Sequence, residues 1–73
     1  MPKLTNISGK EAVKAFLKFG YKHVHTSGDH AILQKLNVPS LSIPLHKEVA
    51  QFLLRAQVKK ANIKIDDFIK SLK

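Results

Sequence analysis

The chain has no cysteine and no tryptophan, and only five of its 73 residues are acidic. Without cysteine, neither a disulfide scaffold nor a zinc site with thiolate ligands is possible. No apolar stretch approaches the roughly 20 residues that span a bilayer, and the first six residues lack the apolar core of a signal peptide. We therefore expect a cytoplasmic protein without membrane association. A chain of this length is expected to form a single domain over residues 1–73.

The shortage of acidic residues leaves a strong positive charge. Thirteen Lys and Arg side chains against five Asp and Glu give a formal net charge of +8. A positive field on so small a body favours anionic partners, which include nucleic acid, an acidic protein and an anionic membrane surface. A lysine-rich surface can also serve solubility alone. The size of the excess favours nucleic acid, without choosing between DNA and RNA.

The beginning of the chain is expected to form a helix over residues 8–19. Ser8 and Glu11 have the spacing of a capping box, in which each side chain accepts a hydrogen bond from the other residue's backbone N–H. Gly20 is a natural helix stop. The expected buried face follows the helical period and consists of Ala12, Val13, Phe16, Leu17 and Phe19.

Three short strands are expected to follow, over residues 21–26, 30–36 and 41–45. Residues 37–40 have the composition of a turn between the second and third strands. Short connections between consecutive strands favour an antiparallel meander. Pro44 has no N–H to donate to a ladder, so the third strand should lie at an edge of the sheet.

The rest of the chain has a helical pattern. The apolar stripe expected on the second helix consists of Val49, Phe52, Leu53 and Ala56. Asn62 can take the left-handed position at its end, and residues 65–70 predict a last short helix. The predicted fold class is therefore α+β, with the order α-β-β-β-α and a short C-terminal helix. Both longer helices should cover one face of a three-stranded antiparallel sheet.

Four histidines are the side chains that titrate nearest to neutral pH. His30 follows the Gly28-Asp29 turn and should stand at the rim of the sheet, where Gly28 leaves room for a ribose-phosphate backbone. The scarcity of carboxylates argues against a nuclease that needs clustered magnesium ligands. If the protein cuts nucleic acid, RNA is favoured, because His30 could take the proton of its 2′-hydroxyl. A strand residue without a catalytic role is the alternative.

His23 and His25 are two residues apart on one expected strand, which would place them on one face. A metal ion bound between them would have only Asp29 and His46 as further ligands nearby in the sequence. Two solvated strand histidines are the better interpretation, so we expect no metal site and no cofactor.

Lysines recur every four residues along the first helix, at Lys10, Lys14 and Lys18, with Lys22 just beyond. This line either contacts phosphates or is simply a solvated helix face. Lys59, near the end of the second helix, belongs to another candidate patch, where cations are also expected for the helix dipole alone. Tyr21 is the only ring expected to be exposed, which argues against recognition by base stacking.

The order of short motifs along residues 8–69 resembles the HicA-type toxins, also called YcfA-like proteins, which are small bacterial and archaeal mRNA interferases. The segments that carry this resemblance are Ser8-Gly9-Lys10-Glu11, Gly20-Tyr21, Gly28-Asp29-His30, Ile43-Pro44-Leu45-His46-Lys47-Glu48, Leu54-Arg55-Ala56 and Ala61-Asn62-Ile63. The resemblance implies a fold like that of double-stranded-RNA-binding domains, ribosome-independent cleavage of mRNA, and neutralisation by a HicB-type antitoxin. It also implies that the family's catalytic histidine corresponds to His30, with Gly28 and Asp29 in the adjoining turn.

The chain departs from the family pattern at three places. Asp29 replaces a commoner serine, so its charge either repels an approaching phosphate or holds His30 in one tautomer. Phe52-Leu53 replaces Gly-Thr, which suggests that the second helix begins early, near Lys47. Basic residues of the second strand are reduced to Lys35.

Three hypotheses follow. The first is a metal-independent endoribonuclease toxin in which His30 is the general base or acid, and in which Gly28, Lys10, Lys14, Lys22 and Lys59 contact RNA. The alternative is a non-catalytic RNA-binding module of the same fold. A third is a protein that only pairs with an acidic partner.

Overall fold

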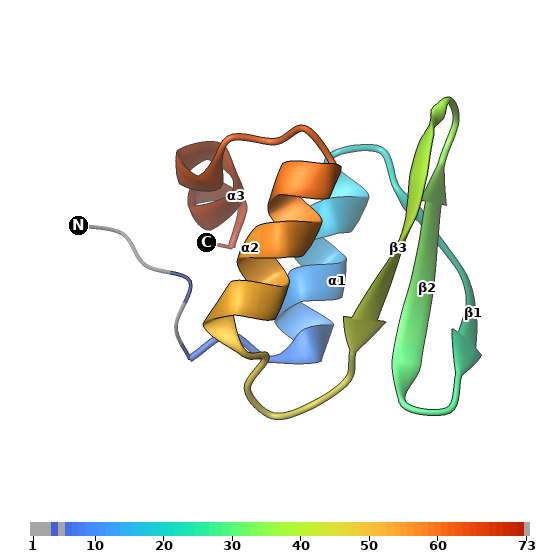
Figure 1. Cartoon of the computed structure of the whole chain (residues 1–73), viewed down its shortest axis with the longest axis horizontal. Coiled ribbons are helices and arrows are strands. Elements are labelled where there is room, and N and C mark those ends of the chain that lie inside the picture. Colours follow the sequence, from blue (N-terminus) through green and yellow to red (C-terminus); the bar gives the residue numbers. More distant parts are fainter. Residues whose placement is uncertain (1–3, 5, 73) are drawn as a thin grey trace.

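The computed structural model describes residue 4 and residues 6–72 of the chain. Its elements follow the predicted order along the chain, and the helices lie on one side of a three-stranded sheet (Figure 1). They are α1 (Gly9–Lys18), β1 (Lys22–Ser27), β2 (His30–Lys35), β3 (Val38–Pro44), α2 (Gln51–Lys60) and α3 (Ile65–Ser71). The α+β prediction and the short C-terminal helix are confirmed. Within the described part of the chain, no helix is long and apolar enough to cross a membrane.

Helix α1 begins with the predicted capping box. The backbone N–H of Glu11 donates to the Ser8 hydroxyl at 3.1 Å, and the N–H of Ser8 donates to the Glu11 carboxylate at 3.1 Å. The helix ends at Phe19 and Gly20, and Gly20 adopts a positive φ of 97°. Ala12, Val13 and Phe16 are buried as expected. The prediction is wrong for Leu17, which is exposed, whereas Ala15, which was not part of the predicted face, is buried.

The sheet is an antiparallel meander with the strand order β1-β2-β3, as predicted. The expected start of the third strand is wrong, because β3 begins at Val38 and not at residue 41. Asn37 alone supplies the left-handed backbone that the turn needs, with φ 66°, so the turn is shorter than expected. Pro44 is the last residue of β3, and β3 is an edge strand, which confirms that prediction.

Helix α2 differs from expectation in both its start and its buried face. It begins at Gln51, so an early start near Lys47 is wrong. Leu54 and Val58 are buried, whereas Phe52 is 73% exposed. Leu53 and Ala56 of the predicted stripe are exposed as well, and Val49 is buried ahead of the helix. The run Phe52-Leu53-Leu54 satisfies two helical stripes, and packing against the sheet selects the one that begins at Leu54.

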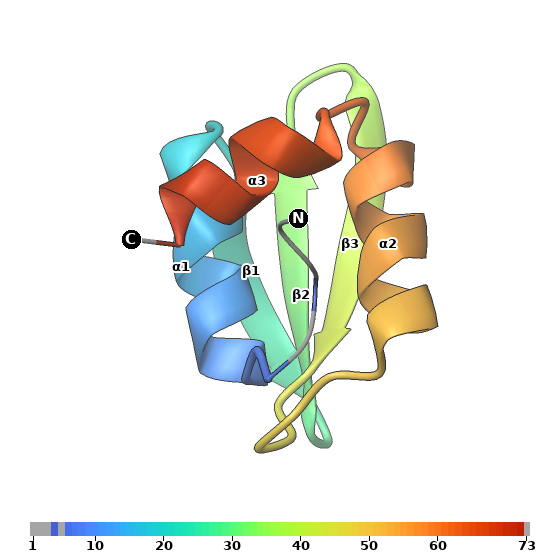
Figure 2. The same ribbon diagram turned by 90° about the vertical axis from the view of Figure 1, so that its left-hand side faces the viewer.

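Helices α1 and α2 cover one face of the sheet, and α3 crosses their outer side (Figures 1 and 2). Phe16 of α1 lies at the centre of this core. Its ring centroid is 4.7 Å from that of Phe68 in α3 and 5.8 Å from that of Tyr21. No element of the described chain covers the other face of the sheet in Figure 1. The fold therefore leaves one sheet face and the sheet's two ends open to partners.

Tyr21 corrects the prediction of an exposed ring. Its side chain is only 3% exposed, and it meets Phe16 edge to face. Its hydroxyl oxygen is buried without a hydrogen-bond partner, and burial raises the pKa of Tyr21 above its usual 10.0. This aromatic residue is therefore part of the core, not a platform for a nucleic-acid base.

Candidate active site

Three chain segments meet at the end of the sheet drawn lowest in Figure 1. The β1–β2 turn brings His30 opposite Pro44, the last residue of β3. Beyond this pair, the N–H of Leu45 donates to the carbonyl oxygen of Asp29 at 2.6 Å, which continues the ladder by one step. The third segment is the start of α1, where Gly9 lies against the backbone of Pro44 and Leu45. A Cβ on Gly9 would lie only 2.2 Å from the carbonyl oxygen of Pro44, so glycine is required for this approach.

The carboxylate of Asp29 links two histidines at this end. Its Oδ1 lies 2.9 Å from Nδ1 of His30, and its Oδ2 lies 3.2 Å from Nε2 of His46. The three side chains are 62%, 46% and 55% exposed for Asp29, His30 and His46, so the cluster is accessible. The hydrogen bond with His46 is the main reason that the pKa of Asp29 is lowered below 3.8, and a backbone hydrogen bond within Asp29 adds to it. Asp29 is therefore a carboxylate at neutral pH.

This geometry bears on the two effects considered for Asp29. An ionised carboxylate can only accept hydrogen bonds, so the 2.9 Å approach of Nδ1 of His30 to Oδ1 of Asp29 favours the tautomer of His30 that has its proton on Nδ1. The Nε2 atom of a neutral His30 then holds a lone pair. Because the His30 side chain is nearly half exposed, this nitrogen is available to take a proton from a bound molecule. Of the two effects considered for Asp29, its contact with His30 favours orientation of the imidazole.

The predicted RNA-contacting residues fall into two groups. Gly28 is at the tip of the turn beside Asp29, with φ 63° and nothing within 4 Å of the place of a Cβ. Lys10 is in the first turn of α1 next to Gly9, and Lys14 is one turn further along. Lys22 instead pairs with Gln34 at the start of β1. Five residues of strand separate it from the turn, about 16 Å.

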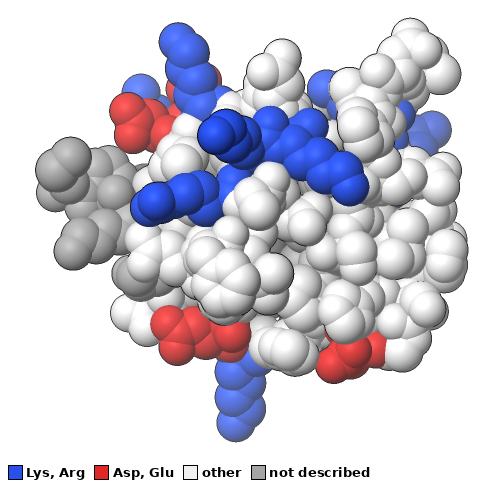
Figure 3. Space-filling model, viewed as in Figure 1, with Lys and Arg blue, Asp and Glu red and all other residues white. Residues whose placement is uncertain are grey.

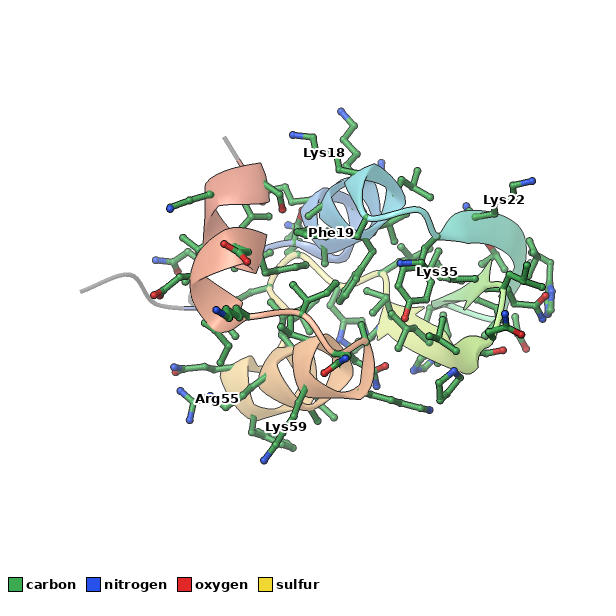
Figure 4. The ribbon with its side chains drawn as sticks, turned by 90° about the horizontal axis from the view of Figure 1, so that it is seen from above. Lys18, Phe19, Lys22, Lys35, Arg55 and Lys59 are labelled. Carbon is green, nitrogen blue, oxygen red and sulfur yellow. The ribbon has the colours of Figure 1, made fainter. Side chains whose placement is uncertain are left out.

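Lys59 lies in the last turn of α2, also at the end away from His30. Figure 3 shows that Lys and Arg gather toward this upper end, and the view from above in Figure 4 shows Lys18, Lys22, Lys35, Arg55 and Lys59 spread from α1 across the sheet to α2. A shallow hollow of about 640 Å³ there is lined by Gly20, Lys22 and Lys35 among others. The Lys35 ammonium lies 5.7 Å from the Tyr21 ring centroid. The structure therefore separates a histidine end from a lysine-rich end.

The prediction that His23 and His25 lie on the same face of the sheet is wrong. A β-bulge shifts the register between them, so that His23 pairs with Leu33 and His25 with Ile32. Neighbouring residues of β2 point to opposite sides of the sheet, and so do their partners. His23 lies 3.0 Å from the Thr26 hydroxyl. Over residue 4 and residues 6–72, no three His, Asp or Glu side chains are grouped so that they could hold a metal ion.

The contact between Asp29 and His46 was not predicted from the sequence. The two residues are 17 positions apart, and only the register of β2 against β3 brings them together. The signal that could have found it is the pairing of residue 30 with residue 44, which a correct start of β3 at Val38 would have given.

The fold and this cluster together define an α+β domain with an exposed carboxylate–histidine site at one end of the sheet. A model of the family described as HicA toxin of bacterial toxin–antitoxin systems matches residues 9–63. The chain therefore belongs to the HicA toxin family, as the resemblance predicted. Comparisons with curated proteins and with solved structures gave no significant match. The family match includes both histidines of the site and ends before α3.

Proposed function

We propose that this protein is a ribosome-independent mRNA interferase, the toxin of a cytoplasmic toxin–antitoxin pair. The observation that carries this proposal is the 2.9 Å contact of Asp29 with His30 at an exposed end of the sheet, inside the region that matches the HicA family. The reaction is endonucleolytic cleavage of RNA without a metal or another cofactor.

The chemistry uses the 2′-hydroxyl of the substrate as the nucleophile. Nε2 of His30 takes the 2′-hydroxyl proton while the 2′-oxygen bonds to phosphorus, and the bond from phosphorus to the 5′-oxygen breaks. The departing 5′-oxygen takes up a proton from an acid at the site or from water, and His30 later gives its proton back to water, so the products are a 2′,3′-cyclic phosphate and a 5′-hydroxyl. Asp29 orients His30 and stabilises the imidazolium that forms. Lys10 supplies positive charge from the first turn of α1 toward the phosphate, where negative charge increases in the transition state.

RNA contact is proposed for both groups of lysines with different roles. Gly28, Lys10 and Lys14 lie on the elements that form the histidine end, so they act close to the scissile phosphate. Lys22 and Lys59 belong to the lysine-rich end and would bind the chain at a distance from the cut. The net charge of +8 supports such binding along much of the molecule.

A HicB-type antitoxin is the proposed protein partner. The histidine end is exposed and the molecule is strongly basic, so an anionic surface that covers His30 would both bind and block it. In a complex of the two proteins, His30 should be inaccessible to solvent. A complex with His30 still open would argue against steric blocking.

The decisive experiment compares His30→Ala with wild type on labelled RNA in the presence of a chelator. Loss of a general base should reduce the cleavage rate by about 10²–10⁴. Because His30 is exposed, the same change should alter the free energy of unfolding by less than about 1 kcal/mol, measured by thermal melting. His23→Ala and His25→Ala are the matched controls and should cut like wild type. Wild-type cleavage by His30→Ala, or full dependence on magnesium, would contradict the proposal.

The non-catalytic RNA-binding module is the second candidate. The gathering of lysines at the end away from His30 favours it, because binding there needs no chemistry at the histidine end. RNA that is bound with equal affinity by wild type and His30→Ala, and cut by neither, would select this alternative.

A further inference from the structure

His46 contacts the same carboxylate as His30, although only His30 was predicted from the sequence as the catalytic residue. Its Nε2 atom lies 3.2 Å from Oδ2 of Asp29, while the other carboxylate oxygen contacts His30 at 2.9 Å. Both oxygens belong to one carboxylate, so the two imidazoles flank one small group. Each ring is left with one nitrogen that does not face Asp29, namely Nε2 of His30 and Nδ1 of His46.

Main-chain hydrogen bonds place His46 independently of its side chain. Its carbonyl oxygen accepts the N–H of Gly9 at 2.9 Å, and the residue before it, Leu45, donates to the carbonyl oxygen of Asp29 at 2.6 Å. The segment is therefore tied to α1 on one side and to the β1–β2 turn on the other. A side chain carried on such a segment needs little rearrangement before the reaction.

Asp29 is the acidic residue whose carboxylate contacts both imidazoles. Glu48 is the next acidic residue along the chain, and its carboxylate accepts the N–H of Asn6 at 3.1 Å. Glu11 is engaged with Ser8 in the capping box. Lys47 directly follows His46 in the sequence, and Lys10 follows Gly9, whose N–H donates to the carbonyl oxygen of His46. Asp29 is thus the acidic partner that contacts His46.

We propose that His46 is the second catalytic histidine, the general acid that protonates the leaving 5′-oxygen while His30 acts as the general base. This inference rests on the proposed ribonuclease function. His30 Nε2 receives the 2′-hydroxyl proton, the 2′-oxygen bonds to phosphorus, and Nδ1–H of His46 gives its proton to the departing 5′-oxygen. His30 ends protonated and His46 neutral, and exchange with water restores both. No oxidant, metal or additional reactant is required.

The test separates the two proton transfers by means of the leaving group. A dinucleotide has a poor alkoxide leaving group that needs protonation, whereas a nucleoside 3′-(4-nitrophenyl phosphate) releases a stable phenolate that does not. His46→Ala should lose about 10²-fold or more in kcat/KM on the dinucleotide and keep the aryl ester within about threefold of wild type. His30→Ala should lose activity on both substrates. Lys47→Ala, a neighbouring exposed residue, is the control.

His46→Gln distinguishes proton donation from positioning. The glutamine amide can still donate a hydrogen bond to Asp29, but it cannot act as a general acid. We expect His46→Gln to fold like wild type and to show the same selective loss on the dinucleotide. Recovery of dinucleotide cleavage by Gln, or equal losses of His46→Ala on both substrates, would reduce His46 to a positioning residue and overturn the inference.

The same experiment shows whether only the role of His46 is wrong or whether the proposed ribonuclease function is wrong as well. A wild-type protein that cuts both substrates, with His46→Ala unchanged on the dinucleotide, refutes only the role of His46. A wild-type protein that cuts neither substrate, in a sample whose melting shows it to be folded, refutes the ribonuclease proposal and this inference together.

Discussion

The backbone N–H of Gly9 donates to the carbonyl oxygen of His46 at 2.9 Å, which joins the first residue of α1 to the segment that carries a histidine of the site. A Cβ at this glycine would meet the carbonyl oxygen of Pro44 at 2.2 Å and the Cα of Leu45 at 2.6 Å. Both of these atoms belong to the backbone, which cannot swing aside as the end of a flexible side chain can. The helix start and the histidine end of the sheet are therefore built as one unit.

Gly9→Ala should destabilise the protein, although replacing glycine by alanine in a helix usually stabilises it by up to about 1 kcal/mol. The backbone clash forces α1 away from residues 44–46, and overpacking of this kind costs about 1–3 kcal/mol. Thermal melting measures the effect, and cleavage should fall with stability because His46 moves. Gly28→Ala is the control: it meets nothing within 4 Å, so only its left-handed backbone is penalised. A Gly9→Ala protein as stable as wild type would show that the close approach is not maintained in solution.

Leu54→Ala and Phe52→Ala should have very different effects on the free energy of unfolding. Leu54 is fully buried, so its truncation should cost about 2–5 kcal/mol. Phe52 is 73% exposed, so its loss should change stability by no more than about 0.5 kcal/mol. Denaturant titration of both variants gives the comparison. The reverse order would mean that α2 is rotated toward the stripe first expected from the sequence.

RNA affinity should fall steeply with salt, because lysines that bind phosphates release counterions. The double change Lys10→Ala with Lys14→Ala and the double change Lys22→Ala with Lys59→Ala should each flatten the plot of log affinity against log salt. The slope should change by about 0.7–0.9 for each phosphate that is no longer neutralised. Binding titrations at several salt concentrations measure these slopes. A slope that changes only for the second pair would limit RNA binding to the lysine-rich end, and an affinity that is indifferent to salt would contradict phosphate binding altogether.

Asp29 should make stability depend on pH in the acid range. The pKa of Asp29 in the folded protein is lowered below its usual 3.8, so folding favours its ionised form. The resulting stabilisation is fully present above that usual value and disappears as the pH falls through the lowered one. Asp29→Asn removes it. Wild type should therefore melt at a higher temperature than Asp29→Asn at about pH 6, and the difference should vanish near about pH 2. A constant difference across this range would show that the carboxylate charge has no part in it.

Features encoded by residues close in sequence were predicted well. The capping box of Ser8 and Glu11 spans three residues, and the glycine turn before His30 is equally local, so both could be predicted directly. The left-handed Asn62, with φ 59°, ends α2 as expected for the same reason. The position of His30 at the rim of the sheet, directly after the turn, could thus be predicted from the sequence, whereas its catalytic role was implied by the family resemblance and stays a prediction.

Features that depend on packing between elements could not be obtained in this way. Phe52, Leu53 and Leu54 are consecutive and apolar, so no period selects the residue that faces the sheet. Tyr21 carries a hydroxyl, as a surface residue often does, but the turn at Gly20 brings its ring against Phe16 in the core. The contact of His46 with Asp29 depends on the β2–β3 register, and hence on the start of β3 at Val38. Residues 37–40 include a proline and have the composition of a turn, so the sequence did not indicate that β3 begins there.

The two edges of the sheet limit how another chain can attach to this protein. Strand β1 is interrupted by the bulge between His23 and His25, and β3 carries proline at positions 39 and 44, neither of which has an N–H. An added strand would meet two missing main-chain donors along β3 and an irregular spacing of donors and acceptors along β1. Partners that approach by β-augmentation are therefore disfavoured at both edges.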